Sequence, residues 1–196
     1  MSGEKGNTVD HHLFVKETRP VSFTPVVLKK IQSLISRYPD GKEKSALLPV
    51  LHIAQEELEG YLSVDVMDYV AGLLNIQPIE VYEAATFYSM FYLEKVGKFV
   101  IDVCRTGPCA ICGGEHILDY LSEKLNIRNG ETTADGLFTL RTVECLGACG
   151  YAPVMQVNNE FHQFLTPEKI DGILEELRNK AKQEQPAGSK WAGKFC

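Results

Sequence analysis

The cysteines of this chain are concentrated in one part of the sequence. None of the six occurs in the first 103 residues, and five lie between residues 104 and 149. The amino terminus carries no apolar stretch typical of a signal peptide, so we expect the chain to stay inside a cell, where thiols are kept reduced. A disulfide framework is then not expected, and clustered thiols in an intracellular protein indicate a metal or redox centre. The six are Cys104, Cys109, Cys112, Cys145, Cys149 and Cys196.

The composition argues against two classes of partner. With 20 Lys and Arg against 26 Asp and Glu, the net charge is −6 when histidine is counted as neutral. An acidic chain does not suit a nucleic-acid or anionic-membrane surface. Hydrophobic residues make up 44% of the chain and charged residues 23%, which is typical of a globular protein with a core. No apolar run approaches the ~18 residues of a membrane span, so we expect no nucleic-acid partner and no direct membrane insertion.

The first half of the chain has a helical pattern. Residues 1–23 are polar and without periodicity, and we predict an arm there. Residues 24–92 contain four short amphipathic stretches with brief links, which indicate a small helical bundle. Thr24 is a plausible N-cap because Pro25 follows it at the first helical position. The four helices are predicted to begin near Thr24, Leu47, Ser63 and Pro78.

After Gly97 the hydrophobic period changes from helical to alternating, so a second domain is predicted over residues 93–180. Its order of elements is strand, helix, strand, hairpin and helix, which is an α/β layout. Asn158-Asn159 suits the tight turn of the hairpin. A polar tail, residues 181–196, follows. The elements are predicted at residues 99–103, 113–126, 137–143, 154–165 and from Thr166-Pro167 onward.

Two cysteine pairs come directly after the two longer predicted strands. Cys104 and Cys109 follow the first strand, and Cys145 and Cys149 follow the second. If the strands are parallel and joined by the intervening helix, their carboxyl ends meet at the same edge of the sheet. Four thiolates that converge from two loops can hold zinc or an iron-sulfur cluster. The spacing alone does not decide between these two.

The most specific segment of the sequence is Glu144-Cys145-Leu146-Gly147-Ala148-Cys149. Together with several other segments, it resembles one family, the thioredoxin-like 2Fe-2S subunits of NADH:quinone oxidoreductase, respiratory complex I. The resemblance covers residues 24 to about 177. The other segments that carry it are Cys104-Arg105-Thr106-Gly107-Pro108-Cys109, Gly130-Glu131-Thr132-Thr133, Phe138-Thr139-Leu140, Ala152-Pro153 and Ala84-Ala85-Thr86-Phe87-Tyr88.

This resemblance implies a small helical bundle followed by a thioredoxin-like α/β ferredoxin domain with one 2Fe-2S cluster. Carried over residue by residue, Cys104 and Cys109 would bind one iron, and Cys145 and Cys149 the other. It also implies a cis peptide bond before Pro153.

The role implied by the resemblance is electron transfer, in which the chain exchanges electrons with the FMN of an NADH-oxidising partner, beside further iron-sulfur subunits. FMN and NADH are expected on the partner, because this chain has no G-x-G-x-x-G after a strand and no phosphate-binding loop. The chain would then be part of an enzyme without a complete active site of its own. We expect it in a peripheral arm on the cytoplasmic face of the bacterial inner membrane rather than in the mitochondrial matrix.

Cys112 leaves alternatives open. With Cys104 and Cys109 it has the plant-type ferredoxin spacing C-x4-C-x2-C, and with Cys109 alone it forms a C-x-x-C dithiol pair. Neither pattern explains both Cys145 and Cys149, so we predict that Cys112 is a small non-ligating residue and that Cys196 is an unpaired thiol. A dithiol oxidoreductase, a structural zinc module and the equivalent subunit of an NAD-linked hydrogenase or formate dehydrogenase stay as alternative functions.

Overall fold

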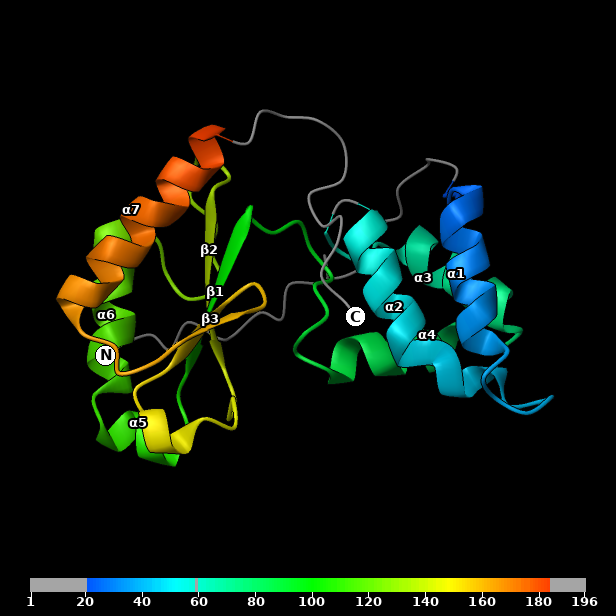
Figure 1. Ribbon diagram of the computed structural model, residues 1–196, viewed down its shortest axis with the longest axis horizontal. Coiled ribbons are helices and arrows are strands. Elements are labelled where there is room, and N and C mark those ends of the chain that lie inside the picture. The colour runs from blue at the N-terminus through cyan, green and yellow to red at the C-terminus, as the bar shows by residue number, and fades with distance from the viewer. Residues whose placement is uncertain (1–20, 59, 184–196) are drawn as a thin grey trace, which may run out of the picture. The chain divides into compact units, whose positions relative to one another are not determined.

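The structure, a computed structural model, describes residues 21–58 and 60–183. These residues form two compact units, which divide between Lys95 and Val96 (Figure 1). Most of the predicted arm and tail, together with Cys196, lies outside the described residues. Within the described ranges, no helix is long and apolar enough to cross a membrane.

The first unit, residues 21–95, is helical, as the sequence pattern predicts. Thr24 and Ser63 are the N-caps of its first and third α-helices, and each hydroxyl accepts a hydrogen bond from the N–H three residues later at 3.4 Å. Such caps satisfy one of the free N–H groups at a helix start. The elements are α1 (Pro25–Ile35), η1 (Glu43–Ala46), α2 (Leu47–Glu57), α3 (Val64–Leu74) and α4 (Pro78–Phe87).

Side chains from all four α-helices pack together in the hydrophobic core of the helical unit. Val50, Leu51 and Val70 are fully buried in it. Phe23, which falls within the predicted arm, is also buried, and its ring centroid lies 5.3 Å from that of Tyr69. A polar segment thus contributes one aromatic anchor to the core, which periodicity does not reveal.

The second unit, residues 96–183, has the predicted α/β order around a four-stranded mixed sheet. The strands lie in the order β2-β1-β3-β4, with β1 and β2 parallel and the other neighbours antiparallel. Helices α6 and α7 pack on one face of this sheet (Figure 1). The elements are β1 (Phe99–Cys104), α5 (Gly107–Ile111), α6 (Gly114–Leu125), β2 (Phe138–Val143), η2 (Cys149–Tyr151), β3 (Met155–Val157), β4 (Glu160–His162) and α7 (Pro167–Gln183).

Strand β1 is buried on both faces at the centre of the sheet. Ile101 and Val103 pack with Leu121 of α6 and Leu174 of α7 in one apolar core. The parallel register pairs Cys104 with Val143, the last residue of β2. The carboxyl ends of β1 and β2 therefore meet at one edge, which confirms the predicted βαβ crossover and brings the two cysteine segments to the same place.

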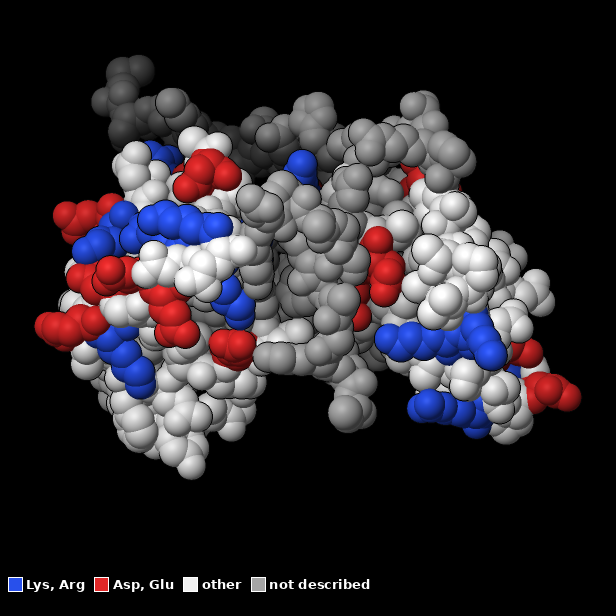
Figure 2. Space-filling view, turned by 45° about the horizontal axis from the view of Figure 1, so that its top comes forward, with Lys and Arg blue, Asp and Glu red and all other residues white. Residues whose placement is uncertain are grey.

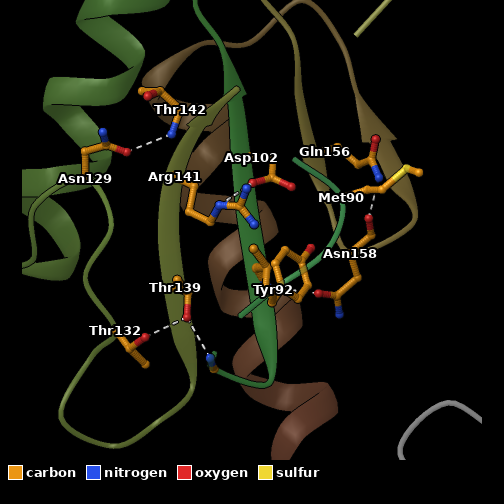
Figure 3. A network of polar contacts seen from close by, with 12 residues as sticks. Met90, Tyr92, Asp102, Asn129, Thr132, Thr139, Arg141, Thr142, Gln156 and Asn158 are labelled. Atoms are coloured by element: carbon orange, nitrogen blue, oxygen red, sulfur yellow. Dashed lines mark hydrogen bonds and ion pairs between the residues drawn. The ribbon is translucent and has the colours of Figure 1, made fainter. Parts of the chain in front are cut away.

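Polar side chains hold the segment between α6 and β2 against the sheet (Figure 3). The Thr139 hydroxyl lies 2.8 Å from that of Thr132 and accepts a 2.6 Å hydrogen bond from the Gly97 N–H. Asn129 Oδ1 accepts the N–H of Thr142 at 2.8 Å. A side chain at Gly97 would place its Cβ 2.9 Å from a backbone atom of Phe138, so only glycine fits this approach.

The hairpin between β3 and β4 turns at the predicted Asn158-Asn159. Asn158 has a φ of +52°, and its Oδ1 accepts the N–H of Val100 at 2.8 Å. The side chain therefore ties the turn to β1. The peptide bond between Ala152 and Pro153 is cis, as the resemblance implies.

Candidate metal centre

The first cysteine pair is buried. Cys104 is the last residue of β1 and is 2% exposed, and Cys109 lies in α5 and is 1% exposed. From Cys104 the chain passes through two residues into α5, a five-residue helix with Pro108 in its first turn. So short a helix leaves no hydrophobic period in a sequence, and the prediction placed no element there.

The second pair is exposed. Cys145 and Cys149 lie after β2, and their Sγ atoms are 3.7 Å apart. Between them Gly147 has a φ of +75°, a conformation that suits glycine. This turn directs the Gly147 N–H at Cys145 Sγ, 3.4 Å away. The turn at Gly147 thus provides a backbone hydrogen bond to the sulfur of Cys145.

The two pairs lie close enough to influence one another. The negative charge of Cys104 acts to raise the pKa of both Cys145 and Cys149, so it opposes their deprotonation. In the same way, the negative charge of Cys149 opposes the deprotonation of Cys109. Arg105 donates to Glu144 Oε1 at 2.9 Å, and so links the neighbour of Cys104 to the neighbour of Cys145. The structure therefore brings together all four predicted site residues.

Within each pair, one thiol is more acidic than the other. Burial raises the pKa of Cys104, but hydrogen bonds from Thr106, Leu146 N–H and the Cys109 thiol outweigh it, so this pKa is lowered. Burial and the negative charge of Cys104 raise the pKa of Cys109 to about 11. The buried pair can thus hold one thiolate that accepts a hydrogen bond from its protonated partner.

The exposed pair shows the same asymmetry from different causes. The Gly147 N–H, followed by a hydrogen bond from Cys149, lowers the pKa of Cys145. The hydrogen bond to Cys145 and the charge of that group raise the pKa of Cys149. Metal binding requires deprotonation of all four groups, so binding would release protons from this site.

Helix α6 begins in close contact with the buried pair, through Gly114. A Cβ at this position would lie 2.8 Å from the carbonyl oxygen of Cys109 and 3.2 Å from that of Cys104. Both are backbone atoms that cannot swing away. The sequence reasoning did not single out Gly114 or Thr106, whose hydroxyl lies 3.4 Å from Cys104 Sγ. Gly114 carries no signal in sequence beyond its distance from a cysteine, and Thr106 appears there only as part of the Cys104–Cys109 segment.

Cys112 stands apart from this arrangement. It is exposed at the C-cap of α5, and none of the sulfur contacts recorded among residues 21–183 involves it. Its assignment as a non-ligating residue stays a prediction.

The donor set fits an iron-sulfur cluster. In the described part of the chain, no group of three or more His, Cys, Asp or Glu side chains is placed to hold a single metal ion. The sulfurs occur as two pairs, and a 2Fe-2S cluster takes two thiolates on each iron. N–H groups of Gly147, Leu146 and Val154 point at these sulfurs, as is usual around such clusters.

Comparison with known sequences decides the family. The sequence pattern of the thioredoxin-like [2Fe-2S] ferredoxin family matches residues 31–178. This chain belongs to that family. The resemblance inferred from the cysteine motifs is therefore confirmed, together with the α/β fold class and the 2Fe-2S cluster as cofactor.

Proteins of bacterial NADH-quinone oxidoreductases are among the relatives of this ferredoxin. The chain is 44% identical over 158 residues to the E subunit of the NADH-quinone oxidoreductase of Rickettsia bellii, and the match covers 81% of this chain and 95% of that protein. It is 46% identical over 150 residues to an E subunit of the same kind of enzyme from Rhizobium meliloti, and this match covers 76% of this chain and 88% of that one.

The fold of this chain is also found among solved structures. The NAD+-reducing [NiFe]-hydrogenase in its air-oxidised state superposes with a TM-score of 0.61 at 21% identity. The match covers 76% of this chain and 25% of the hydrogenase chain, so the common fold occupies a quarter of that longer polypeptide.

Proposed function

We propose that this chain is the 2Fe-2S electron-transfer subunit of an NADH-quinone oxidoreductase. The observation that carries the proposal is the convergence of two cysteine pairs at one sheet edge in a chain that aligns with nearly the whole length of named E subunits. The cluster supplies one-electron chemistry, and the protein supplies thiolates, hydrogen bonds and position. Such a chain is one part of an oxidoreductase and has no complete active site of its own.

In this proposal Cys104 and Cys109 bind one iron, and Cys145 and Cys149 bind the other. The two pairs come from separate segments, one at the end of β1 and one after β2. Residues 106–114 and 145–159, which carry three of these cysteines and their surroundings, contain no charged side chain. Figure 2 agrees, since the end of the second unit that holds α5 is largely white.

We place the electron donor on another chain, a flavin-binding subunit that oxidises NADH, with further iron-sulfur subunits in the same assembly. The absence of a G-x-G-x-x-G after a strand in this sequence supports that division. Apart from the exposed Arg105–Glu144 ion pair, the segments 106–114 and 145–159 would give a protein partner a surface without charges to desolvate. The bacterial relatives support a place in a peripheral arm at the cytoplasmic face of the inner membrane.

Substitution of the four cysteines tests the proposal. Cys104→Ser, Cys109→Ser, Cys145→Ser and Cys149→Ser are each expected to reduce cluster content or alter its spectrum in purified protein, because each removes one thiolate from an iron. Cys112→Ser is the matched control and should leave the spectrum unchanged. Iron, acid-labile sulfide, visible absorption and electron paramagnetic resonance of the reduced protein are the measurements.

The outcomes separate the alternatives. An unchanged spectrum in any of the four variants contradicts the ligand assignment. Zinc without iron or sulfide would indicate a structural zinc module. A colourless protein that reduces insulin disulfides through Cys109 and Cys112 would indicate a dithiol oxidoreductase. For the NAD-linked hydrogenase alternative, the likeness shown is one of fold at 21% identity, so the proposal follows the NADH-quinone oxidoreductase relatives at 44% and 46% identity.

A further inference from the structure

Thr106 occupies an unusual position at the metal centre. It is the N-cap residue of α5, two residues after Cys104, yet its side chain makes no capping hydrogen bond. Threonine at an N-cap normally uses its hydroxyl to accept a backbone N–H. Here the hydroxyl lies 3.4 Å from Cys104 Sγ instead. The group is therefore directed at a sulfur at the expense of its usual role in the helix.

The same hydroxyl also reaches the second cysteine pair. A hydrogen bond from Thr106 helps to lower the pKa of Cys145, after those from Gly147 and Cys149, and another helps to lower that of Cys104. Cys104 and Cys145 belong to different segments and, in the proposed function, to different irons.

Apart from the thiols of Cys109 and Cys149, the other donors at these sulfurs come from the backbone. The N–H groups of Leu146 and Gly147 point at Cys104 and Cys145 respectively. Among the side-chain hydroxyl groups of residues 21–183, that of Thr106 is the one recorded at a cysteine sulfur. Its contribution can therefore be removed by mutation without changing the path of the chain.

We propose that Thr106 is a positioning residue that donates its hydroxyl hydrogen bond to the cysteine ligands and raises the reduction potential of the centre. The inference rests on the proposed function, because it requires Cys104 and Cys145 to be ligands. One-electron reduction adds negative charge that is shared with the sulfurs. A hydrogen-bond donor stabilises the more negative state, so it favours reduction.

The test is a redox titration of the purified cluster-containing protein, followed by electron paramagnetic resonance. Thr106→Val keeps the branched shape and removes the hydroxyl, and we expect it to shift the equilibrium constant for reduction about tenfold toward the oxidised state. For one electron this shift corresponds to a potential lower by about 59 mV. Thr106→Ser retains the hydroxyl and should keep a potential near that of the unmodified protein.

Thr142→Val is the matched control. Thr142 lies on β2, three residues before Cys145, and its hydroxyl makes no hydrogen bond to a cysteine sulfur among the described residues. It should not change the potential. An equal potential in the unmodified protein and in Thr106→Val would overturn the inference, and so would an equal shift in Thr106→Ser and Thr106→Val.

Failure of assembly also has a defined meaning. If Thr106→Val binds no cluster, Thr106→Ala removes the hydroxyl without adding bulk and takes its place in the titration. Loss of the cluster in both, with retention in Thr106→Ser, would overturn the inference, because the hydroxyl would then serve assembly rather than potential. If the unmodified protein itself gives no signal of a reduced 2Fe-2S centre, it is the proposed function that fails.

Discussion

The two cysteine pairs have the same chemistry and opposite surroundings. Cys104 and Cys109 are almost fully buried, at the end of a central strand and in a short helix packed beside α6. Cys145 and Cys149 are exposed, in a segment that turns at glycine after β2. Each pair nevertheless has one thiol of lowered pKa and one of raised pKa.

This difference shows that hydrogen bonding and burial have separate effects at the site. Hydrogen bonds to sulfur decide which thiol of a pair is deprotonated first. Burial decides how easily solvent, reagents and a partner protein reach the sulfur. In the proposed function, the exposed pair is the side of the centre from which electrons would be exchanged, and the buried pair fixes the centre to the fold.

The largest expected effect comes from Gly114→Ala, which disturbs the packing of α6 against the buried cysteine pair. The new methyl group would meet the backbone of Cys109 at 2.8 Å, and overpacking against groups that cannot move costs about 3 kcal/mol. We expect a lower urea midpoint and loss of the cluster. Gly150→Ala, in the exposed segment, has no heavy atom within 4 Å of its Cβ and no positive φ, so it should change neither. Equal effects of the two substitutions would contradict this account.

The next effect is on thiol reactivity in cluster-free protein. With a pKa of about 11 against an ordinary 9.0, Cys109 has a thiolate fraction near pH 8 that is ~100-fold smaller than that of a free thiol. The pKa of Cys145 is lowered, so more of it is thiolate. Alkylation by iodoacetamide, followed by mass spectrometry, should therefore modify Cys145 at least ~100-fold faster than Cys109.

The pH dependence of that reaction gives a sharper comparison. Because thiolate forms as pH rises through the pKa, the rate at Cys145 should level off below the pH at which an ordinary thiol does, and that at Cys109 should rise until about pH 11. Cys104 separates the two effects, since its pKa is lowered although it is buried. A fast reaction at Cys104 would show that burial does not limit access.

The smallest effect is expected from the ion pair that links the two segments. Arg105→Gln removes the 2.9 Å ion pair with Glu144. Because both side chains are exposed, this ion pair should contribute about 0.5 kcal/mol to the free energy of unfolding. The loss should disappear in about 1 M salt, because salt screens exposed charges. Lys124→Gln removes an ion pair with Asp171, also between exposed side chains, and is the matched control. A shift that persists in high salt would mean that Arg105 acts by packing instead.

Most elements of the fold follow from local patterns in the sequence. The helical period and the capping residues Thr24 and Ser63 predict helices in the first unit, and alternation at residues 99–103 predicts the central strand. Asn158 predicts the turn of the hairpin. These signals are readable because each depends on neighbours within a few positions of the chain.

The metal centre could be predicted in part for a similar reason. Two cysteine pairs placed after two strands indicate convergence, because parallel strands end at one edge. Helix α5 could not be predicted, since five residues carry no period. Phe23 could not be assigned to the core either, because nothing near it in sequence shows that Tyr69 covers it.

The amino-acid sequence by itself determined that four cysteines occur as two pairs, each after a strand, and it predicted the crossover that brings the pairs together. The tertiary structure decided which pair is buried, why Gly114 must lack a side chain and where the Thr106 hydroxyl points. Burial, close approach and hydrogen bonding to sulfur depend on atoms from segments far apart in sequence. The spacing of residues within one segment does not predict contacts with distant segments, so these contacts are known only from the folded structure.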